Sequence, residues 1–404
     1  MNDVVIVDAV RTPIGRRNGG LSTMHSIDLL GTVQQEVLDR AGVDPAEVGQ
    51  VVGGCVGQVG MQGMNVTRNA WLAAGLPMEV AASTVDAQCG SAQQATNLAA
   101  ALVAAGHVEV AIGCGVEVMS RVTMGSTIPR DPDVGKPINR RYREQHEWTS
   151  QFEGAERIAD QWGISREECD VFGKLSQDRA ARAWEEGRFE TQVVPVAAPD
   201  VDADGKPTGS THEVVRDEGL RETTLEGLAA LKPTGRPDGA HTAGSSSQIA
   251  DGAAAVLLMT RAKAETLGLT PKATIVQSCL VGCDPVLMLE GPIPATRKLL
   301  GDNALEMSDI DVVEINEAFA SVVLAWQREL EPDMEKVNPN GGAIAIGHPL
   351  GGTGAILLTK ALHELERSDA EQAIVTMCCG GGLGSGTVLR RGCRAAAAGT
   401  RART

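Results

Sequence analysis

One cysteine of the chain lies where a predicted strand gives way to a predicted helix. The segment Val85-Asp86-Ala87-Gln88-Cys89-Gly90-Ser91 runs from a β-branched residue into small residues that leave room for a substrate carbonyl. A helix N-terminus carries partial positive charge and free N–H groups, and both favour a thiolate. The position therefore predicts a lowered pKa for Cys89 and a role as a nucleophile. The alternative is a thiol that only packs at a strand–helix corner.

Two polar residues follow a buried strand further along the chain. Asn316 and Glu317 come directly after the apolar run Val312–Ile315. Enzymes with α/β folds place functional groups at the carboxyl ends of their strands, so Asn316 is a candidate site residue. The alternative is that Asn316 caps the helix that follows.

The densest pattern is a glycine-rich segment around a single imidazole. Six glycines lie between Gly341 and Gly354, and His348 stands in the middle of them. Glycines of this density bring bare backbone close to another group. A phosphate-binding loop is disfavoured because the G-K-[ST] signature is absent. His348 is therefore a candidate catalytic residue. The alternative is a histidine of the core or of a helix cap whose hydrogen bonds are satisfied and which has no catalytic role.

A second thiol position stands before a run of glycines. Cys378-Cys379-Gly380-Gly381-Gly382 follows the buried run Ala373–Met377. Glycines at a strand end expose backbone N–H groups, which can form an oxyanion hole. The alternative is a tight turn that needs glycine only for its dihedral angles.

The elements that must position these residues alternate along the chain between strand and helix. The order is typical of a layered α/β domain. The expected strands are Val4–Val7, Val48–Gly54, Val80–Asp86, Val108–Gly115, Asp251–Thr260 and Ala273–Val276, and the expected helices are Ser26–Ala41, Asn65–Ala74, Ser91–Ala105 and Thr353–Leu365.

The alternation breaks between Met119 and Gly244. This stretch holds three prolines near its start and the Asp/Gly/Pro-rich segment Ala198–Gly209, which predicts irregular structure. Helices are expected inside it at Ser150–Trp162 and Arg166–Glu186. Long excursions from a rigid scaffold usually shape a binding site, so we expect an inserted subdomain with that role.

The second half of the chain resembles a degenerate copy of the first. The phrase that leads into the strand Val48–Gly54 recurs before the strand Val312–Ile315. Cys89 opens a helix of small residues in the first half, and His348 opens the corresponding helix in the second. A duplicated fold would bring both helix N-termini towards one central site.

Composition excludes several classes of protein. With 36 basic and 52 acidic residues the net charge is −16, so a nucleic-acid surface is not expected. The apolar runs are too short to cross a membrane, and the N-terminus lacks a signal peptide, so the sequence predicts a cytoplasmic protein. The nine cysteines contain no C-x-x-C pair, which argues against a zinc site and a disulfide framework.

Taken together, the four motifs resemble those of the thiolases. Cys89-Gly90-Ser91, Asn316-Glu317-Ala318-Phe319, Gly347-His348-Pro349 and Cys378-Cys379-Gly380 occur in the order of that family, and the resemblance covers residues 3–391. The segments 11–15 and 243–252 are also similar. The resemblance implies a thiolase-like α/β fold of two duplicated domains in five layers with a loop domain. It implies degradative or biosynthetic acyl transfer on acyl-CoA.

The resemblance also implies a role for each residue. Cys89 would be the acylated nucleophile and Cys378 the acid and base. His348, with a water held by Asn316, would bind the thioester oxygen as the enolate develops. The N–H groups of Cys89 and Gly380 would form a second oxyanion hole. Coenzyme A contacts would come from Ser247, Phe319, Ala318 and Arg221.

From the resemblance we expect an N-terminal domain at 1–120 and 245–272, a loop domain at 121–244, a C-terminal domain at 273–391 and a tail at 392–404. Coenzyme A is expected as co-substrate, with no permanently bound cofactor and no metal. Acyl-CoA is the expected partner, and a homodimer or homotetramer is the expected assembly.

Two departures bear on the substrate. Many thiolases carry Met-Gly-x-Thr-Ala-Glu where this chain has Gln151-Phe152-Glu153-Gly154-Ala155-Glu156. The segments 11–22 and 331–334 are similar to actinobacterial thiolases of lipid and sterol side-chain breakdown. These features favour cleavage of a 3-ketoacyl-CoA larger than acetoacetyl-CoA. Alternatives are acetoacetyl-CoA synthesis, a ketoacyl synthase, which would use one cysteine and two histidines, and a non-catalytic lipid carrier.

Overall fold

A mixed sheet runs through the whole molecule and carries both halves of the chain. The structure is a computed structural model that describes residues 2–202 and 204–392. The strands are β1 (Val4–Arg11), β2 (Gly15–Arg16), β3 (Gln50–Gly54), β4 (Ala81–Val85), β5 (Val110–Val118), β6 (Val196–Val201), β7 (Pro207–Val214), β8 (Ala250–Thr260), β9 (Ala273–Gly282), β10 (Val312–Ile315), β11 (Gln372–Cys379) and β12 (Leu383–Arg391). The α-helices are α1 (Ser26–Ala41), α2 (Val66–Ala73), α3 (Ser91–Ala104), α4 (Arg140–Gln145), α5 (Gln151–Trp162), α6 (Arg166–Glu185), α7 (Leu225–Ala229), α8 (Arg261–Thr266), α9 (Pro292–Asp302), α10 (Ala320–Leu330), α11 (Ala343–Ile346) and α12 (Thr353–Arg367).

The strand order confirms the duplication expected from the sequence. The first half has the order β1-β8-β5-β3-β4 and the second half has β9-β12-β11-β10. A parallel bridge between Val313 and Val337 supplies the place that β4 fills in the first half. In each half the two pairings nearest the centre of the sheet are antiparallel, and the pairings towards its outer edge are parallel. Cys89 and His348 therefore follow equivalent strands.

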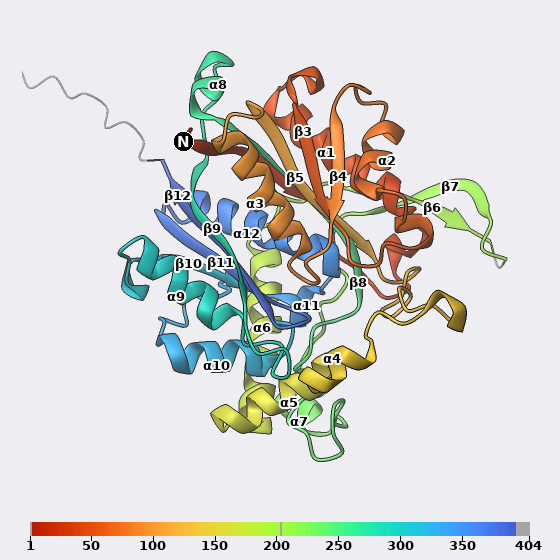
Figure 1. The fold of residues 1–404 in the computed structure, drawn as a ribbon, viewed down its shortest axis with the longest axis vertical. Helices are drawn as coiled ribbons and strands as arrows, with labels where there is room; N and C mark the ends of the chain where they lie inside the picture. Colours follow the sequence, from red (N-terminus) through yellow and green to blue (C-terminus); the bar gives the residue numbers. More distant parts are fainter. Residues whose placement is uncertain (1, 203, 393–404) are drawn as a thin grey trace, which may run out of the picture.

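Three apolar cores separate the layers. The side chains of strand β1 point to its two faces in turn. Val5, Val7 and Val10 pack into one core with α1, while Val4 and Ile6 pack into a second core. That second core is filled by α3 and α12 and lies between the two halves of the sheet. A third core joins α9 and α10 to the second half (Figure 1). Strand alternation of this kind lets one sheet bury both faces.

The two central helices cross at very short range near their N-termini. A Cβ on Gly354 of α12 would overlap the backbone nitrogen of Gln93 in α3, so only glycine fits there. The contact brings together the helices that begin just after Cys89 and His348. The fold thus places Cys89 and His348 near neighbouring helix N-termini.

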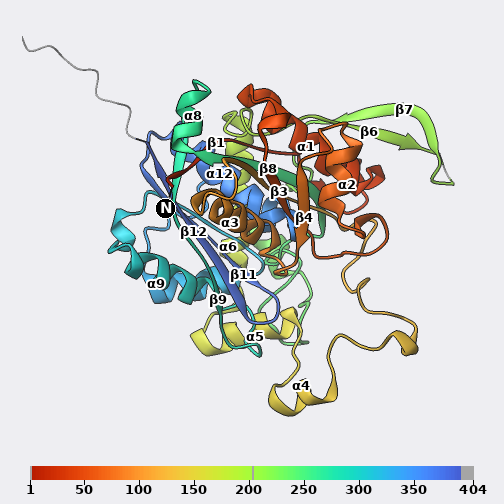
Figure 2. The ribbon, with the colours of Figure 1, turned by 45° about the horizontal axis from the view of Figure 1, so that its top comes forward.

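The excursion between Met119 and Gly244 holds α4 to α7 and the hairpin β6–β7, which projects from the body together with the α4 arm (Figure 2). The irregular structure predicted for Ala198–Gly209 is wrong, because much of this segment pairs in the hairpin. The turn residues Asp202 and Gly205 explain the error, since they suggest a loop but serve here as the hairpin turn. Over the described ranges, no helix is long and apolar enough to span a bilayer.

Candidate active site

A strained turn presents Cys89. Gln88 adopts a φ of 52°, which is rare for a residue with a side chain. Hydrogen bonds hold this turn, because the Gln88 N–H donates to Asp86 Oδ1 at 2.7 Å and its carbonyl accepts from the Ser91 hydroxyl at 2.6 Å. Helix α3 begins at Ser91. Strain maintained by surrounding bonds is typical of functional sites.

The lowered pKa expected for Cys89 is wrong for this structure. Burial raises the pKa of the Cys89 thiol to about 11, against the lowering effect of backbone hydrogen bonds from Gly380 and from Cys89 itself. Loss of hydration therefore outweighs the helix terminus. The same two N–H groups were expected to form an oxyanion hole, and both face the Cys89 sulfur. A resting thiol at this position needs a base to become a nucleophile.

Cys378 lies at the end of β11, close to the nucleophile. Burial raises the pKa of Cys378 well above its usual value, and the nearby Cys89 raises it further. The pKa of the Cys378 thiol is therefore far above neutral pH in the resting site. Cys379 also lies against this turn, since a Cβ on Gly90 would stand 2.5 Å from its sulfur. The geometry favours a protonated Cys378 that can act as an acid.

His348 is buried and bonded on both ring nitrogens. Its Nδ1 lies 2.6 Å from Thr353 Oγ1, and its Nε2 lies 3.4 Å from Asn316 Nδ2. The backbone N–H of His348 donates to the Gln248 carbonyl at 3.0 Å. Burial lowers the pKa of His348 to about 4, so the ring is neutral near pH 7.

Asn316 carries an unsatisfied atom into this site. Its side chain is fully buried, and its Oδ1 has no hydrogen-bond partner among the residues that the structure describes. Buried polar atoms are nearly always paired, so an orphan oxygen marks a place for water or a ligand. The capping alternative is wrong, because α10 begins at Ala320 with Phe319 as its N-cap.

A buried carboxylate next to these residues forms hydrogen bonds with both halves of the chain. Glu117 accepts hydrogen bonds from the Val56 and Gly57 N–H groups at 3.0 Å and from the Gly351 N–H at 2.9 Å. Gly351 lies in the loop that carries His348. The sequence pattern did not single out Glu117, Gln248 or Thr353. Only Thr353 had a local signal, as a hydroxyl residue that opens a helix after His348.

The residues expected to contact coenzyme A fall into two groups. Ser247 donates its N–H to the Ala318 carbonyl at 2.9 Å, and Ser246 pairs with Phe319 in an antiparallel bridge. The Phe319 ring packs edge-on against Phe152, with centroids 5.6 Å apart. Arg221 lies apart from these residues with an exposed side chain. Its backbone N–H donates to Gln177 Oε1 at 2.9 Å.

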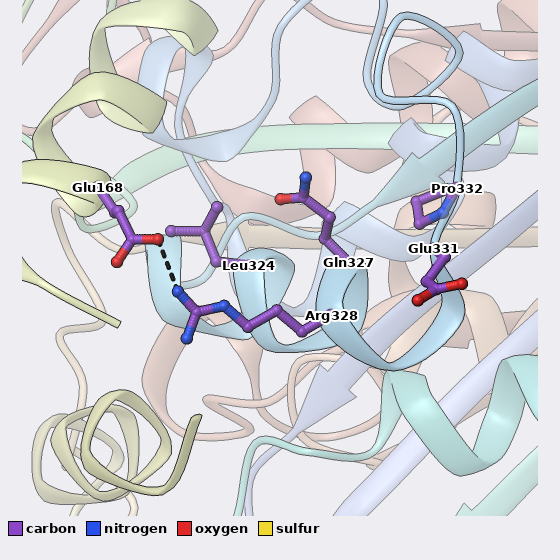
Figure 3. Close-up of a pocket in the computed structure, with 6 residues that line it drawn as sticks. All are labelled: Glu168, Leu324, Gln327, Arg328, Glu331 and Pro332. Atoms are coloured by element: carbon purple, nitrogen blue, oxygen red, sulfur yellow. Dashed lines mark hydrogen bonds and ion pairs between the residues drawn. The ribbon is translucent and has the colours of Figure 1, made fainter. Parts of the chain in front are cut away.

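A surface hollow elsewhere on the molecule is separate from this site. It has a volume of about 470 Å³ and lies between α6 and α10, where Arg328 pairs with Glu168 at 2.6 Å (Figure 3). No candidate catalytic residue lines it. Its lining holds one ion pair, Arg328 with Glu168, and a further carboxylate, Glu331.

Comparisons with known proteins agree with this arrangement. The thiolase N-terminal domain family matches residues 4–262, and the thiolase C-terminal domain family matches residues 269–391. The chain belongs to the thiolase family. A steroid 3-ketoacyl-CoA thiolase, FadA6, of Mycobacterium tuberculosis is 43% identical over 97% of this chain and 95% of that protein. A 3-ketoacyl-CoA thiolase of Aliivibrio fischeri is 41% identical over 97% of this chain and 100% of that protein.

A solved structure extends the likeness to three dimensions. The acetyl-CoA acetyltransferase of Bacillus anthracis matches this thiolase with a TM-score of 0.88 and 37% identity, covering 97% of this chain and 99% of the other. The expected thiolase-like α/β fold is thereby confirmed. This thiolase is an acyltransferase, and thiolases act on acyl-CoA with coenzyme A as co-substrate.

Acid should weaken the fold through His348. An unfolded histidine titrates near pH 6.5, whereas burial lowers the folded pKa to about 4. The unfolded chain therefore binds this proton first, and stability present above pH 6.5 is lost as pH falls towards 4, by up to about 3 kcal/mol. Urea unfolding across this range should show a shallower pH slope for His348→Asn. Exposed His107→Asn is the control, and equal slopes in both variants would contradict the expectation.

Proposed function

We propose that this thiolase cleaves 3-ketoacyl-CoA with coenzyme A, releasing acetyl-CoA or propionyl-CoA and a shortened acyl-CoA. The reaction passes through an acyl group on Cys89 and is reversible as a Claisen condensation. The observation that carries the proposal is the convergence of the Gly380 and Cys89 N–H groups on the Cys89 sulfur. Two N–H donors at that point can stabilise a tetrahedral oxyanion.

In the first half-reaction, Cys89 gives its proton to His348 and attacks the 3-keto carbon. The C2–C3 bond breaks, and its electron pair forms the enolate of acetyl-CoA. His348 and a water on Asn316 stabilise the enolate oxygen, and Cys378 donates its proton to C2. In the second half, the Cys378 thiolate takes the proton of incoming coenzyme A. The coenzyme A sulfur then accepts the acyl group, and Cys89 regains its proton from His348.

Coenzyme A enters as a co-substrate in this proposal and no cofactor stays bound. The backbone pairing of Ser247 with Ala318 and the edge of Phe319 would line the pantetheine arm. The exposed guanidinium of Arg221 would meet the phosphates. Because the chain carries a net charge of −16, attraction for this polyanion must be local.

Replacing Arg221 should separate binding from chemistry. Arg221→Ala is expected to raise KM for coenzyme A roughly tenfold while kcat stays nearly constant, as for loss of uniform binding. The measurement is steady-state thiolysis with coenzyme A varied. Arg141→Ala, on the exposed helix α4, is the matched control. A fall in kcat at unchanged KM would place Arg221 elsewhere.

The substrate is proposed to be larger than acetoacetyl-CoA. The remodelled segment 151–156 and the name of the FadA6 relative support this class. The alternative, acetoacetyl-CoA synthesis, is supported by the acetyl-CoA acetyltransferase likeness. Measuring kcat/KM across 3-ketoacyl-CoA chain lengths, with one sterol-derived thioester, decides between them. A preference for acetoacetyl-CoA would favour the alternative, and absence of any thiolysis would refute the proposed function.

A homodimer or homotetramer is proposed as the assembly. Strand β4 is the edge of the sheet, and an open edge is a place for another strand to pair. Met64 and Met78 near it are 93% and 71% exposed. Sedimentation equilibrium should give at least a dimer mass, whereas a monomer would contradict the proposal.

The domain boundaries and a cytoplasmic location stay predictions from the sequence. Limited proteolysis tests the boundaries, because cleavage should concentrate in the proposed loop domain, 121–244. Cell fractionation tests the location. The predicted tail lies almost wholly outside the described residues, which end at Gly392.

A further inference from the structure

The hydroxyl of Thr353 lies between two groups that compete for its single proton. Thr353 is the first residue of α12 and is 2% exposed. Its Oγ1 is 2.6 Å from His348 Nδ1 and 2.9 Å from the Pro349 carbonyl oxygen. A threonine hydroxyl donates one hydrogen bond and accepts others, so only one of these neighbours receives the proton.

Counting protons favours the Pro349 carbonyl as the acceptor. If Thr353 donates there, its oxygen accepts Nδ1–H of His348, and the Nε2 lone pair accepts from Asn316 Nδ2 at 3.4 Å. All three bonds are then satisfied. If Thr353 donates to Nδ1 instead, the neutral ring carries its proton on Nε2, which faces the donor Nδ2 of Asn316. That arrangement leaves two donors opposed.

Turning the Asn316 amide over would remove the clash but would make fewer bonds. The Nε2–H could then donate to Asn316 Oδ1, while the amide nitrogen would lose its partner. The hydroxyl would also lose its bond to the Pro349 carbonyl. The network with Nδ1–H therefore contains one more hydrogen bond than its rival. A buried site favours the network that satisfies more polar atoms.

We propose that Thr353 is a positioning residue that holds His348 in the Nδ1–H tautomer, so that the bare Nε2 accepts the proton of the Cys89 thiol. The inference rests on the proposed function for its catalytic meaning, but the tautomer belongs to the resting protein. Thr353 touches only the distal side of the ring and not the reacting atoms. It acts on the reaction through His348.

This tautomer explains how the Cys89 thiol is activated, and it sets the order in which His348 acts as a base and as a donor. The ring is a base first, because Nε2 carries no proton at rest. Once it has taken the Cys89 proton, Nε2–H becomes a donor and can stabilise the enolate oxygen. The Nδ1–H···Oγ1 bond persists through both states, so the ring keeps one orientation throughout.

The direct test reads the tautomer of the resting enzyme. Full-length protein labelled with ¹⁵N-histidine should show His348 with a protonated Nδ1 and a bare Nε2, whose ¹⁵N shifts differ strongly. His348→Asn assigns the signals among the seven histidines. Thr353→Val should shift the ring towards Nε2–H, whereas Thr353→Ser should keep the wild-type pattern. Nε2–H in the wild type would overturn the proposal without any reference to activity.

Kinetics supply the second arm. Thr353→Val is expected to lower kcat for thiolysis roughly 10- to 100-fold with little change in KM for coenzyme A, and Thr353→Ser should restore it. Thr359→Val is the matched control, because Thr359 is buried on the same helix and its hydroxyl donates to the Ala355 carbonyl at 2.8 Å. An equal loss in Thr359→Val would indicate a merely structural effect and contradict the proposal. If wild-type protein lacks thiolysis, the proposed function fails while the tautomer result stands.

Discussion

Cys89→Ala is expected to lower kcat for thiolysis by roughly 10⁴-fold or more. Removing a nucleophile eliminates the covalent path and leaves only the stabilisation that binding and the oxyanion donors provide. Cys114→Ala is the control, because burial also raises the pKa of the Cys114 thiol, to about 12. Cys114 packs in the core that contains α1, whereas Cys89 packs against the core that contains α3 and α12. Its replacement should leave activity nearly unchanged.

The same variant identifies the acylated residue. Wild-type protein incubated with acyl-CoA should gain the mass of one acyl group, and peptide mapping should place it on Cys89. The mass should not change in Cys89→Ala. Cys379→Ala is the informative companion, because this thiol lies against Gly90 yet has no assigned role. Label on Cys378 or Cys379 would reverse the roles that we propose.

Local signals were sufficient for the elements that carry the site. Helix α1 covers Ser26–Ala41 as predicted, because its apolar spacing ends at Gly42, which adopts a φ of 66° as a helix C-cap. The order of motifs was sufficient to identify the family. In contrast, helix α9, the bounds of α10 and the full length of β9 did not stand out in the sequence. Their apolar residues pack against distant strands, and this contact is not visible in local periodicity.

The pKa values of the site residues could not be predicted from the sequence, for a different reason. A helix N-terminus is a local feature, so its effect on Cys89 could be expected. Burial by the second half of the chain is not local, and it raises the pKa instead. One bond that orients His348 comes from the nearby Thr353, but the others come from Asn316 and Gln248, which only the fold brings to this residue. The identity of the site could therefore be predicted, but not its resting protonation.

Cys378→Ala should lose thiolysis by roughly 10²–10⁴-fold, the usual contribution of general acid and base catalysis. Two proton transfers depend on this thiol, one to the enolate carbon and one from coenzyme A. Asn316→Ala should cost roughly 10²–10³-fold, as for removal of one oxyanion donor. Both residues serve cleavage of the same bond, so the double variant should lose less than the product of the two effects. The measurement is the steady-state kcat for thiolysis of the two single variants and the double variant.

Acylation of Cys89 by a saturated acyl-CoA separates the two oxyanion holes. This exchange forms no enolate. It therefore needs the Gly380 and Cys89 N–H groups, but it does not need the water that we propose Asn316 holds for the enolate oxygen. Asn316→Ala should therefore keep most of the acylation rate measured by quenched-flow mass spectrometry. Cys378→Ala should keep less, because departing coenzyme A thiolate benefits from a nearby acid. If Asn316→Ala abolished acylation as completely as cleavage, one shared hole would serve both steps, and the assignment of the water on Asn316 to the enolate would be wrong.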